Sequence, residues 1–347
     1  MLSLEPKKMA EVSIPVSTGW LLGSCMEALG KQELWIRKKP EVLKVLRERA
    51  IIQSVESSNR IEGVTIKADR LRPVILGEAI PQDRSEEELS GYRQALKWIF
   101  TRENRIVVSP EVIREMHHLA QRGFSGDAGQ WKTKNNEIIE LLPNGERRIR
   151  FSPTSAEDTP RMVEVLCRNY REACEEQHIP VLLVIATFIF DLLCIHPFRD
   201  GNGRVSRLMT TLLLRENGFE VQRFVSLERI VEESKEDYYL ILENCSRGWH
   251  EGSNEIVSWW NYFLGILNRA YRELELLLES SEPRPAKSQI VQQTILAQLE
   301  QFTLSDLTAQ LPSVSSQLIK KILTELKQQG KIRLQGRGRG ARWEVIP

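Results

Sequence analysis

The sequence predicts an all-α protein that also contains two small β-hairpins. Apolar residues recur at helical spacing through most of the 347 residues. Two stretches, 137–151 and 331–346, are instead typical of paired strands around a turn. Pro283 and Pro285 indicate a linker, because two prolines separated by one residue disfavour helix on both sides. We therefore expect two or three domains with a boundary near residue 283, as the chain length also favours.

The composition is that of an ordinary globular protein. Charged residues make up 27%, hydrophobic residues 41%, and the formal net charge is +1, so no globally electrostatic partner is implied. No apolar run reaches the roughly 18 residues of a membrane span, and the first residues lack the blocks of a secretion signal. The five cysteines are widely spaced and form no C-x-x-C pair, which favours a reducing compartment. We expect a cytoplasmic protein that does not bind membranes.

The first hairpin is predicted between Glu137 and Phe151. Its strands, Glu137 to Leu142 and Glu146 to Phe151, flank Pro143-Asn144-Gly145. Asn-Gly supplies the positive φ angles that a tight turn needs. On these residues alone, an ordinary surface hairpin remains a sufficient interpretation.

The C-terminal region predicts three helices followed by a hairpin. The expected elements are helices over 289–301, 305–311 and 315–329, and strands over 331–335 and 342–346. In the third helix one apolar stripe is predicted to be buried, formed by Ile319, Ile322, Leu323 and Leu326. This order resembles a winged helix-turn-helix domain, in which the third helix is the recognition helix.

The C-terminal region is also locally basic. Residues 287–347 contain nine basic and four acidic side chains, a net charge of +5. Arg337-Gly338-Arg339-Gly340-Ala341-Arg342 would form a flexible wing tip whose arginines reach phosphates or a minor groove. Binding of DNA through 285–347 is therefore one hypothesis, and a protein-docking module or a homodimer contact is an equally favoured one.

The stretch from His196 to Arg207 is predicted to join two helices. Residues 181–194 are apolar nearly all round, which is typical of a helix buried in a bundle. Downstream, an apolar stripe recurs at helical spacing and ends at Asn217-Gly218, a sound helix stop. The connecting loop therefore lies at the N-terminus of a rigid helix.

The residue types in this loop suit a phosphate and its metal ion. The amides of Gly201-Asn202-Gly203, together with the helix dipole, can cradle an anion. Arg204 and Arg207 are three residues apart, so both guanidinium groups can converge on that anion. Asp200 offers the hard oxygen that magnesium prefers. His196 is the group able to take a proton from an attacking hydroxyl near neutral pH.

The loop matches a known signature at every specified position. His196-Pro197-Phe198-Arg199-Asp200-Gly201-Asn202-Gly203-Arg204-Val205-Ser206-Arg207 fits the pattern H-P-F-x-[DE]-G-N-G-R-x-x-R. The chain thereby resembles the Fic (Fic/DOC) family over roughly residues 15–275, including Gly129-Gln130-Trp131-Lys132 and Tyr238-Tyr239. The resemblance implies an N-terminal helical region at 1–105 and a Fic core at 106–280 with the hairpin as its flap. The winged helix predicted from its own helix and strand order follows at 281–347.

The resemblance also implies an enzyme, a protein adenylyltransferase that moves AMP from ATP, with Mg2+, to a tyrosine, threonine or serine hydroxyl of a target protein. The target would present an extended segment to the flap. His196 would be the general base, Asp200 the metal ligand and Phe198 the anchor of the loop. The nucleotide would be held by Gly201, Asn202, Gly203, Arg204, Arg207 and Tyr239, with Arg207 on the γ-phosphate.

A second motif resembles the inhibitory motif of the family. Ser58-Asn59-Arg60-Ile61-Glu62-Gly63 fits [ST]-x-x-x-E-[GN]. The resemblance implies that Glu62, with Ser58 in the same motif, pairs with Arg207 and denies it to the γ-phosphate. The plain alternative is a helix end at which Glu62 pairs with a neighbouring arginine.

Other chemistries remain open. Phosphate-transferring relatives carry alanine and lysine where this chain has Gly201 and Gly203, so the glycines favour AMP transfer. Removal of AMP from a modified protein would use the same groups, with Glu62 orienting a water molecule. Ser246 stands where many relatives have an asparagine in the nucleoside pocket, which leaves selectivity for adenine less secure than phosphate binding.

Overall fold

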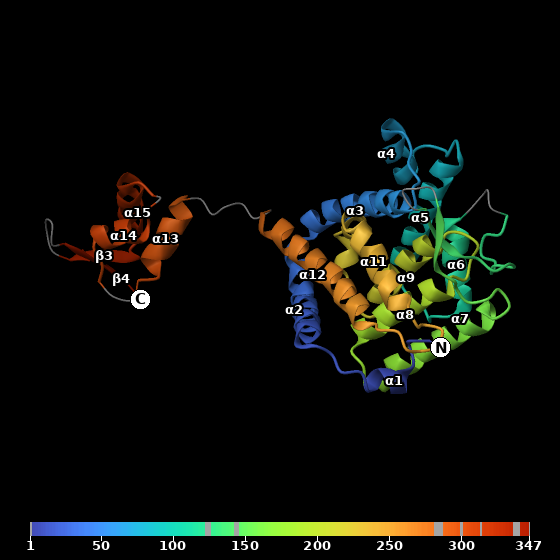
Figure 1. Cartoon of the computed structure of the whole chain (residues 1–347). Helices are drawn as coiled ribbons and strands as arrows, with labels where there is room; N and C mark the ends of the chain where they lie inside the picture. The colour runs from blue at the N-terminus through green and yellow to red at the C-terminus, as the bar shows by residue number, and fades with distance from the viewer. Residues whose placement is uncertain are drawn as a thin grey trace. The chain divides into compact units, whose positions relative to one another are not determined.

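Helices account for most of the chain, and the described residues form only two antiparallel strand pairs (Figure 1). The computed structural model describes residues 2–121, 126–141, 146–280, 287–298, 301–312, 314–335 and 341–346. The predicted all-α class with two hairpins is confirmed. The chain divides into two units, Met1–Leu278 and Glu279–Pro347. The predicted linker lies mostly in 281–286, outside the described residues.

The first unit holds the N-terminal region and the predicted core together. Its helices are α1 (Pro6–Ala10), α2 (Val16–Lys38), α3 (Pro40–Ile61), α4 (Ala68–Leu76), α5 (Arg84–Thr101), α6 (Pro110–Ala120), α7 (Thr159–Glu176), α8 (Val181–Ile195), α9 (Asn202–Glu216), α10 (Leu227–Glu233), α11 (Lys235–Ser246) and α12 (Val257–Ser280). A short 3-10 turn spans Val221–Arg223. Among the described residues, none of the helices is long and apolar enough to cross a membrane.

Helix α8 is the buried centre on which the site depends. It packs against α7 and α9, and all of its residues except Val181 and Leu193 are fully buried. This confirms the helix predicted from the apolar run. The helix ends where His196 adopts a positive φ of 51°, while the His196 N–H still donates to the Leu192 carbonyl. The change of direction starts the loop to α9.

The C-terminal turn of α3 lies beside the N-terminus of α9. Gly201, at φ 76°, precedes α9. The apolar stripe of α9 packs into the core, and the helix ends at Asn217 and Gly218 as predicted. Pro40 stands at the start of α3, and Glu62 closes its last turn. Because α3 packs on α5, α9 and α10, its C-terminal turn is held beside the start of α9.

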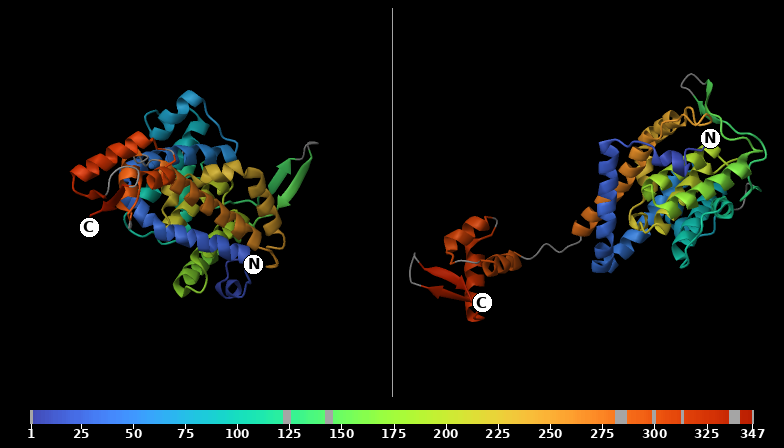
Figure 2. Two further views of the ribbon diagram at one scale, coloured as in Figure 1. Left: turned by 90° about the vertical axis from the view of Figure 1, so that its left-hand side faces the viewer. Right: turned by 90° about the horizontal axis from the view of Figure 1, so that it is seen from below.

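The first hairpin consists of β1 (Ile138–Leu141) and β2 (Arg147–Phe151). The strands pair antiparallel, with Ile139 opposite Ile149 and an irregularity between Ile138 and Ile139. The predicted turn at 142–145 lies outside the described residues. The hairpin extends away from the helices (Figure 2), so both of its faces are accessible over much of their length.

The second unit contains α13 (Lys287–Leu296), α14 (Leu304–Gln310), α15 (Ser316–Gln328), β3 (Ile332–Gln335) and β4 (Arg342–Val345). The predicted stripe on α15 is buried against Val291, Ile295 and Phe302. The helix predicted over 289–301 is too long, because α13 ends at Leu296 and Phe302 forms an extended bridge with Trp343. The wing tip at 336–340 lies outside the described residues.

A buried carboxylate ties the N-terminal segment to α8. Asp191 is fully buried and accepts hydrogen bonds from the Ser3 N–H at 3.0 Å, the Leu4 N–H at 2.7 Å and the Trp249 indole at 2.7 Å. Burial raises the pKa of Asp191 to about 6, although the three donors act in the opposite direction. The folded protein therefore holds this proton more tightly than an unfolded chain, in which the pKa is about 3.9.

We predict that Asp191 gives stability a distinct pH dependence. Its protonation stabilises the fold fully below about pH 4, and this contribution, about 3 kcal/mol, is lost as the pH rises through 6. Asp191→Asn cannot titrate, so the stability difference between wild type and variant should shrink by that amount between pH 4 and 7. Urea unfolding at steps across this range measures it, with the exposed Asp69→Asn as control. A constant difference would contradict the assignment.

Candidate active site

The loop between α8 and α9 is fixed by one buried aromatic side chain. Phe198 stacks on His117 with 3.8 Å between ring centroids and lies 5.1 Å from Trp131. The Asn202 side chain accepts from the Phe198 N–H at 2.9 Å and donates to its carbonyl at 2.8 Å. Asn202 thus closes the loop with the same amide group that the resemblance assigns to phosphate.

His196 has one ring nitrogen free for chemistry. Its Nδ1 lies 3.2 Å from the Leu193 carbonyl, which only accepts, so Nδ1 carries the hydrogen and Nε2 holds a lone pair. Burial lowers the pKa of His196 to about 4, and the charge of Lys132 acts in the same direction. The imidazole is therefore neutral at neutral pH, the form that a general base requires.

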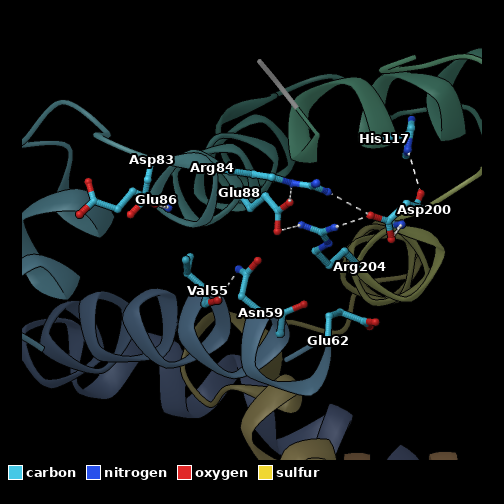
Figure 3. A network of polar contacts seen from close by, with 12 residues as sticks. Val55, Asn59, Glu62, Asp83, Arg84, Glu86, Glu88, His117, Asp200 and Arg204 are labelled. Carbon is cyan, nitrogen blue, oxygen red and sulfur yellow. Dashed lines mark hydrogen bonds and ion pairs between the residues drawn. The ribbon is translucent and has the colours of Figure 1, made fainter. Parts of the chain in front are cut away.

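Asp200 stands exposed at the end of the loop (Figure 3). Its side chain is 59% exposed; Oδ1 accepts from the Gly201 N–H at 2.7 Å, and Oδ2 lies 3.4 Å from Arg84 Nη2. The described residues contain no cluster of three or more acidic, histidine or cysteine ligands for a metal. A single accessible carboxylate fits Mg2+, which usually takes few protein ligands and completes its shell with phosphate and water oxygens.

Arg204 and Arg207 do not converge on a single partner. Arg204 is buried against α5, where its Nη1 lies 2.9 Å from Glu88 Oε2, and Glu88 also accepts from Arg84 (Figure 3). Arg207 instead faces α3. The two arginines thus have different carboxylate partners, because α9 lies between two helices that each supply one, and their convergence on one anion stays a prediction.

Arg207 is bound on three sides by the end of α3. Its Nε donates to Ser58 Oγ at 2.8 Å, and its Nη2 donates to the Ser58 carbonyl at 2.9 Å and to Glu62 Oε1 at 2.8 Å. Burial would lower the pKa of Arg207, but Glu62 and the neighbouring phenols outweigh it and raise the pKa above its ordinary value. The Arg207 side chain is 7% exposed and that of Glu62 31%, so the acid is the accessible partner.

Glu62 lies directly over the start of α9. A Cβ atom at position 203 would overlap Glu62 Oε1, so a larger residue there would require the carboxylate to shift. No side chain caps the N-terminus of α9, and the Gly201 N–H is occupied by Asp200. A carboxylate therefore occupies the space beside the helix start that the sequence predicts for a phosphate.

A cavity of about 390 Å³, a size typical of small-molecule sites, brings half of the predicted site residues together. Predicted residues that line it are Glu62, His196, Gly203, Arg207, Tyr239 and Ser246. The described residues Asp200, Gly201, Asn202 and Arg204 are not among its lining, and Ser58 lies behind Arg207.

Two pairs of site residues were not identified from the sequence. Arg150 of β2 donates to the Tyr239 carbonyl at 2.7 Å and pairs with Glu243 at 3.1 Å, which fastens the flap to α11. Arg84 and Glu88 connect α5 to Asp200 and Arg204. The spacing of Arg84 and Glu88 by four residues indicates an ion pair on a helix, but the same spacing is common in exposed ion pairs outside any functional site.

Comparisons with known proteins agree on the fold. Residues 107–214 match the model of the Fic/DOC family. A probable protein adenylyltransferase of Aquifex aeolicus is 29% identical over 218 residues, 60% of this chain and 61% of that protein. The protein adenylyltransferase Fic of Nematostella vectensis is 21% identical over 58% of this chain and 44% of its own length. The chain thus spans about three fifths or less of these relatives.

Solved structures extend the similarity in fold. A Fic family protein from Desulfovibrio desulfuricans G20 aligns with a TM-score of 0.61 at 18% identity, over 99% of this chain and 98% of its own. A Fic domain containing signaling protein from Bacteroides thetaiotaomicron aligns with a TM-score of 0.63 at 21% identity, over 75% of this chain and 98% of its own. At these identities the alignments establish the architecture.

We predict that His196 stays neutral far below its ordinary range. Its imidazole resonances in an NMR titration should move near pH 4, and activity should fall with protonation in that region rather than near 6.5. His196→Gln assigns the signals, and circular dichroism at each pH verifies that the fold persists. A midpoint above 6 would show that the ring is not buried as described.

Proposed function

Because this chain belongs to the Fic family, we propose that it is a magnesium-dependent protein adenylyltransferase that Glu62 holds in an inhibited state. The observation that carries the proposal is the cavity in which His196 and Arg207 both lie and into which Glu62 also reaches. A neutral base, the uncapped start of α9 and a buried guanidinium group are what AMP transfer from ATP needs.

The transfer proceeds in one displacement at the α-phosphorus. His196 Nε2 takes the proton of the target hydroxyl while the hydroxyl oxygen forms a bond to that phosphorus. The bond from the α-phosphorus to the bridging oxygen breaks, and pyrophosphate leaves. The amides at the start of α9 and Arg207 hold the phosphates in line. Mg2+ on Asp200 would supply positive charge to the same phosphates.

Inhibition by Glu62, which we call the brake, is a competition between two anions for Arg207. Glu62 and the terminal phosphate of ATP would each satisfy Arg207 Nη2, and they cannot do so together. A charge-assisted hydrogen bond contributes about 1.5–3 kcal/mol, enough to keep most molecules inhibited. Because Glu62 ends a helix and is partly exposed, moving it does not require the core to open.

The flap provides a surface for the target. Ile139 and Ile149 pair across the hairpin and are both exposed. An extended segment can add to a strand edge through main-chain hydrogen bonds, which positions a hydroxyl with little demand on sequence. We therefore propose that the partner is a protein segment without regular structure, presented along this hairpin.

Removal of the brake should reveal the activity. With ATP labelled on the α-phosphate, Glu62→Gly should increase labelling of protein at least tenfold, since about 1.4 kcal/mol corresponds to a factor of ten. His196→Ala should abolish labelling in both backgrounds, and Glu48→Ala, an exposed acid on the same helix, should behave as wild type.

Two outcomes would change the assignment. Labelling only from ATP tagged on the γ-phosphate would identify phosphate transfer, and equal labelling with and without Glu62 would remove the brake. Glu62 also shares the cavity with His196, so it can orient a water molecule for removal of AMP. Release of AMP by wild type from protein modified by the Glu62→Gly variant would identify that reaction.

We also propose that the second unit binds duplex DNA. Lys320, Lys321 and Lys327 are exposed on α15 outside its buried stripe, and Lys331 is exposed in the turn that follows. A helix that presents lysines in this way can contact phosphates on both sides of a groove.

The prediction is salt-dependent binding by the full chain. Fluorescence anisotropy with a labelled duplex should show affinity falling steeply between 50 and 200 mM salt, as roughly expected for several phosphate contacts. Lys320→Glu with Lys327→Glu should weaken binding at least tenfold, whereas Lys97→Glu on α5 should not. If the wild-type protein binds the duplex no better than the double variant, docking to a protein is favoured instead. Light scattering would then test for a homodimer.

A further inference from the structure

Arg207 has a second acidic neighbour, behind the site and away from the cavity. Glu228 of α10 is 3% exposed, and within the described part of the chain no cation pairs with it. Its partners are hydroxyl groups: Tyr92 Oη at 3.0 Å, Ser54 Oγ at 2.7 Å and Ser226 Oγ at 3.3 Å. A buried carboxylate held only by hydroxyls needs a compensating charge nearby.

A line of hydroxyls connects this carboxylate to Arg207. Arg207 Nε donates to Ser58 Oγ at 2.8 Å, and the Ser58 side chain lies beside the Tyr92 hydroxyl. The Tyr92 hydroxyl donates to Glu228 Oε1. The Ser58 and Tyr92 hydrogens can both point away from the guanidinium group and towards the carboxylate, so each of these two hydroxyls can accept on one side and donate on the other. Ser58 and Tyr92 are both fully buried.

The two acids near Arg207 therefore differ in kind. Glu62 is partly exposed and ends α3, whereas Glu228 lies in the core between α3, α5 and α10. When Glu62 withdraws, a guanidinium group left alone in the core would cost several kcal/mol. Glu228 belongs to α10, so a movement of the end of α3 does not carry it away. Because the Ser58 Oγ accepts from Arg207 Nε through a lone pair, its hydrogen is left to face Tyr92.

We propose that Ser58, Tyr92 and Glu228 form a relay that positions Arg207 for the terminal phosphate of ATP after Glu62 leaves. They are positioning residues, because none of them touches the nucleotide site directly except through Arg207. The proposal rests on the proposed function for the identity of the ligand. The predicted state of Arg207 is independent of the proposed function, because it can be observed without nucleotide.

The first test compares nucleotides in the Glu62→Gly background. Tyr92→Phe removes one hydroxyl and should raise the Kd for ATP roughly five- to tenfold, while the Kd for AMP changes less than twofold. Glu228→Gln should act in the same direction. The matched control is Tyr271→Phe, another buried tyrosine, whose hydroxyl donates to Gln32 at 2.9 Å away from Arg207. It should leave the ratio of the two Kd values unchanged.

The second test observes Arg207 itself. In Glu62→Gly protein without nucleotide, the Arg207 Nε–H should give a slowly exchanging NMR signal, assigned with Arg207→Lys, and Tyr92→Phe should remove its protection. A retained signal, or equal weakening of ATP and AMP, would overturn the relay. If Glu62→Gly protein binds no ATP, the proposed function fails, and the protection of Arg207 still decides the relay.

Discussion

The buried guanidinium group of Arg207 is the interaction on which the site depends. An arginine cannot lose its charge in a protein, so burying it obliges the surrounding helices to supply acceptors. Here α3 supplies three of them within one turn, from Ser58 and Glu62. These bonds join residues about 145 positions apart in the sequence and hold the end of α3 over the start of α9. The shape of the cavity follows from that cation.

The same cation explains why the control of the site is separate from its base. Glu62 contacts Arg207 and crowds Gly203, whereas His196 is held by Leu193 and stays neutral in either arrangement. In the proposed mechanism, moving Glu62 therefore alters which anions bind, and it removes a charge that raises the pKa of His196, so the imidazole stays neutral. A carboxylate and a phosphate present similar oxygens to a guanidinium group, and this similarity lets a side chain stand in for a ligand.

The sequence predicted those parts that depend on local pattern. The apolar run gave α8, and Asn217-Gly218 gave the end of α9. The strands of both hairpins followed from alternation and turn residues. Contacts between side chains that tertiary packing brings together were harder to predict. Periodicity carries no information that Arg204 meets Glu88 rather than the anion of Arg207, and α13 ends early because Phe302 pairs with a strand 41 residues later. The pairing of Glu62 with Arg207 came from family resemblance alone.

Glu228 shows what such reasoning misses and why it matters. In the sequence it is one acid among 47 acidic side chains, near the start of a short helix, where acids are common. Only the fold reveals that it is buried behind Arg207 and bound to three hydroxyls. If Glu62 exchanges with a phosphate as proposed, the site needs a counter-charge that does not exchange. Without that counter-charge, release of Glu62 would leave an uncompensated cation in the core. The Arg207 side chain would then move out with Glu62 instead of staying in place to bind the ligand.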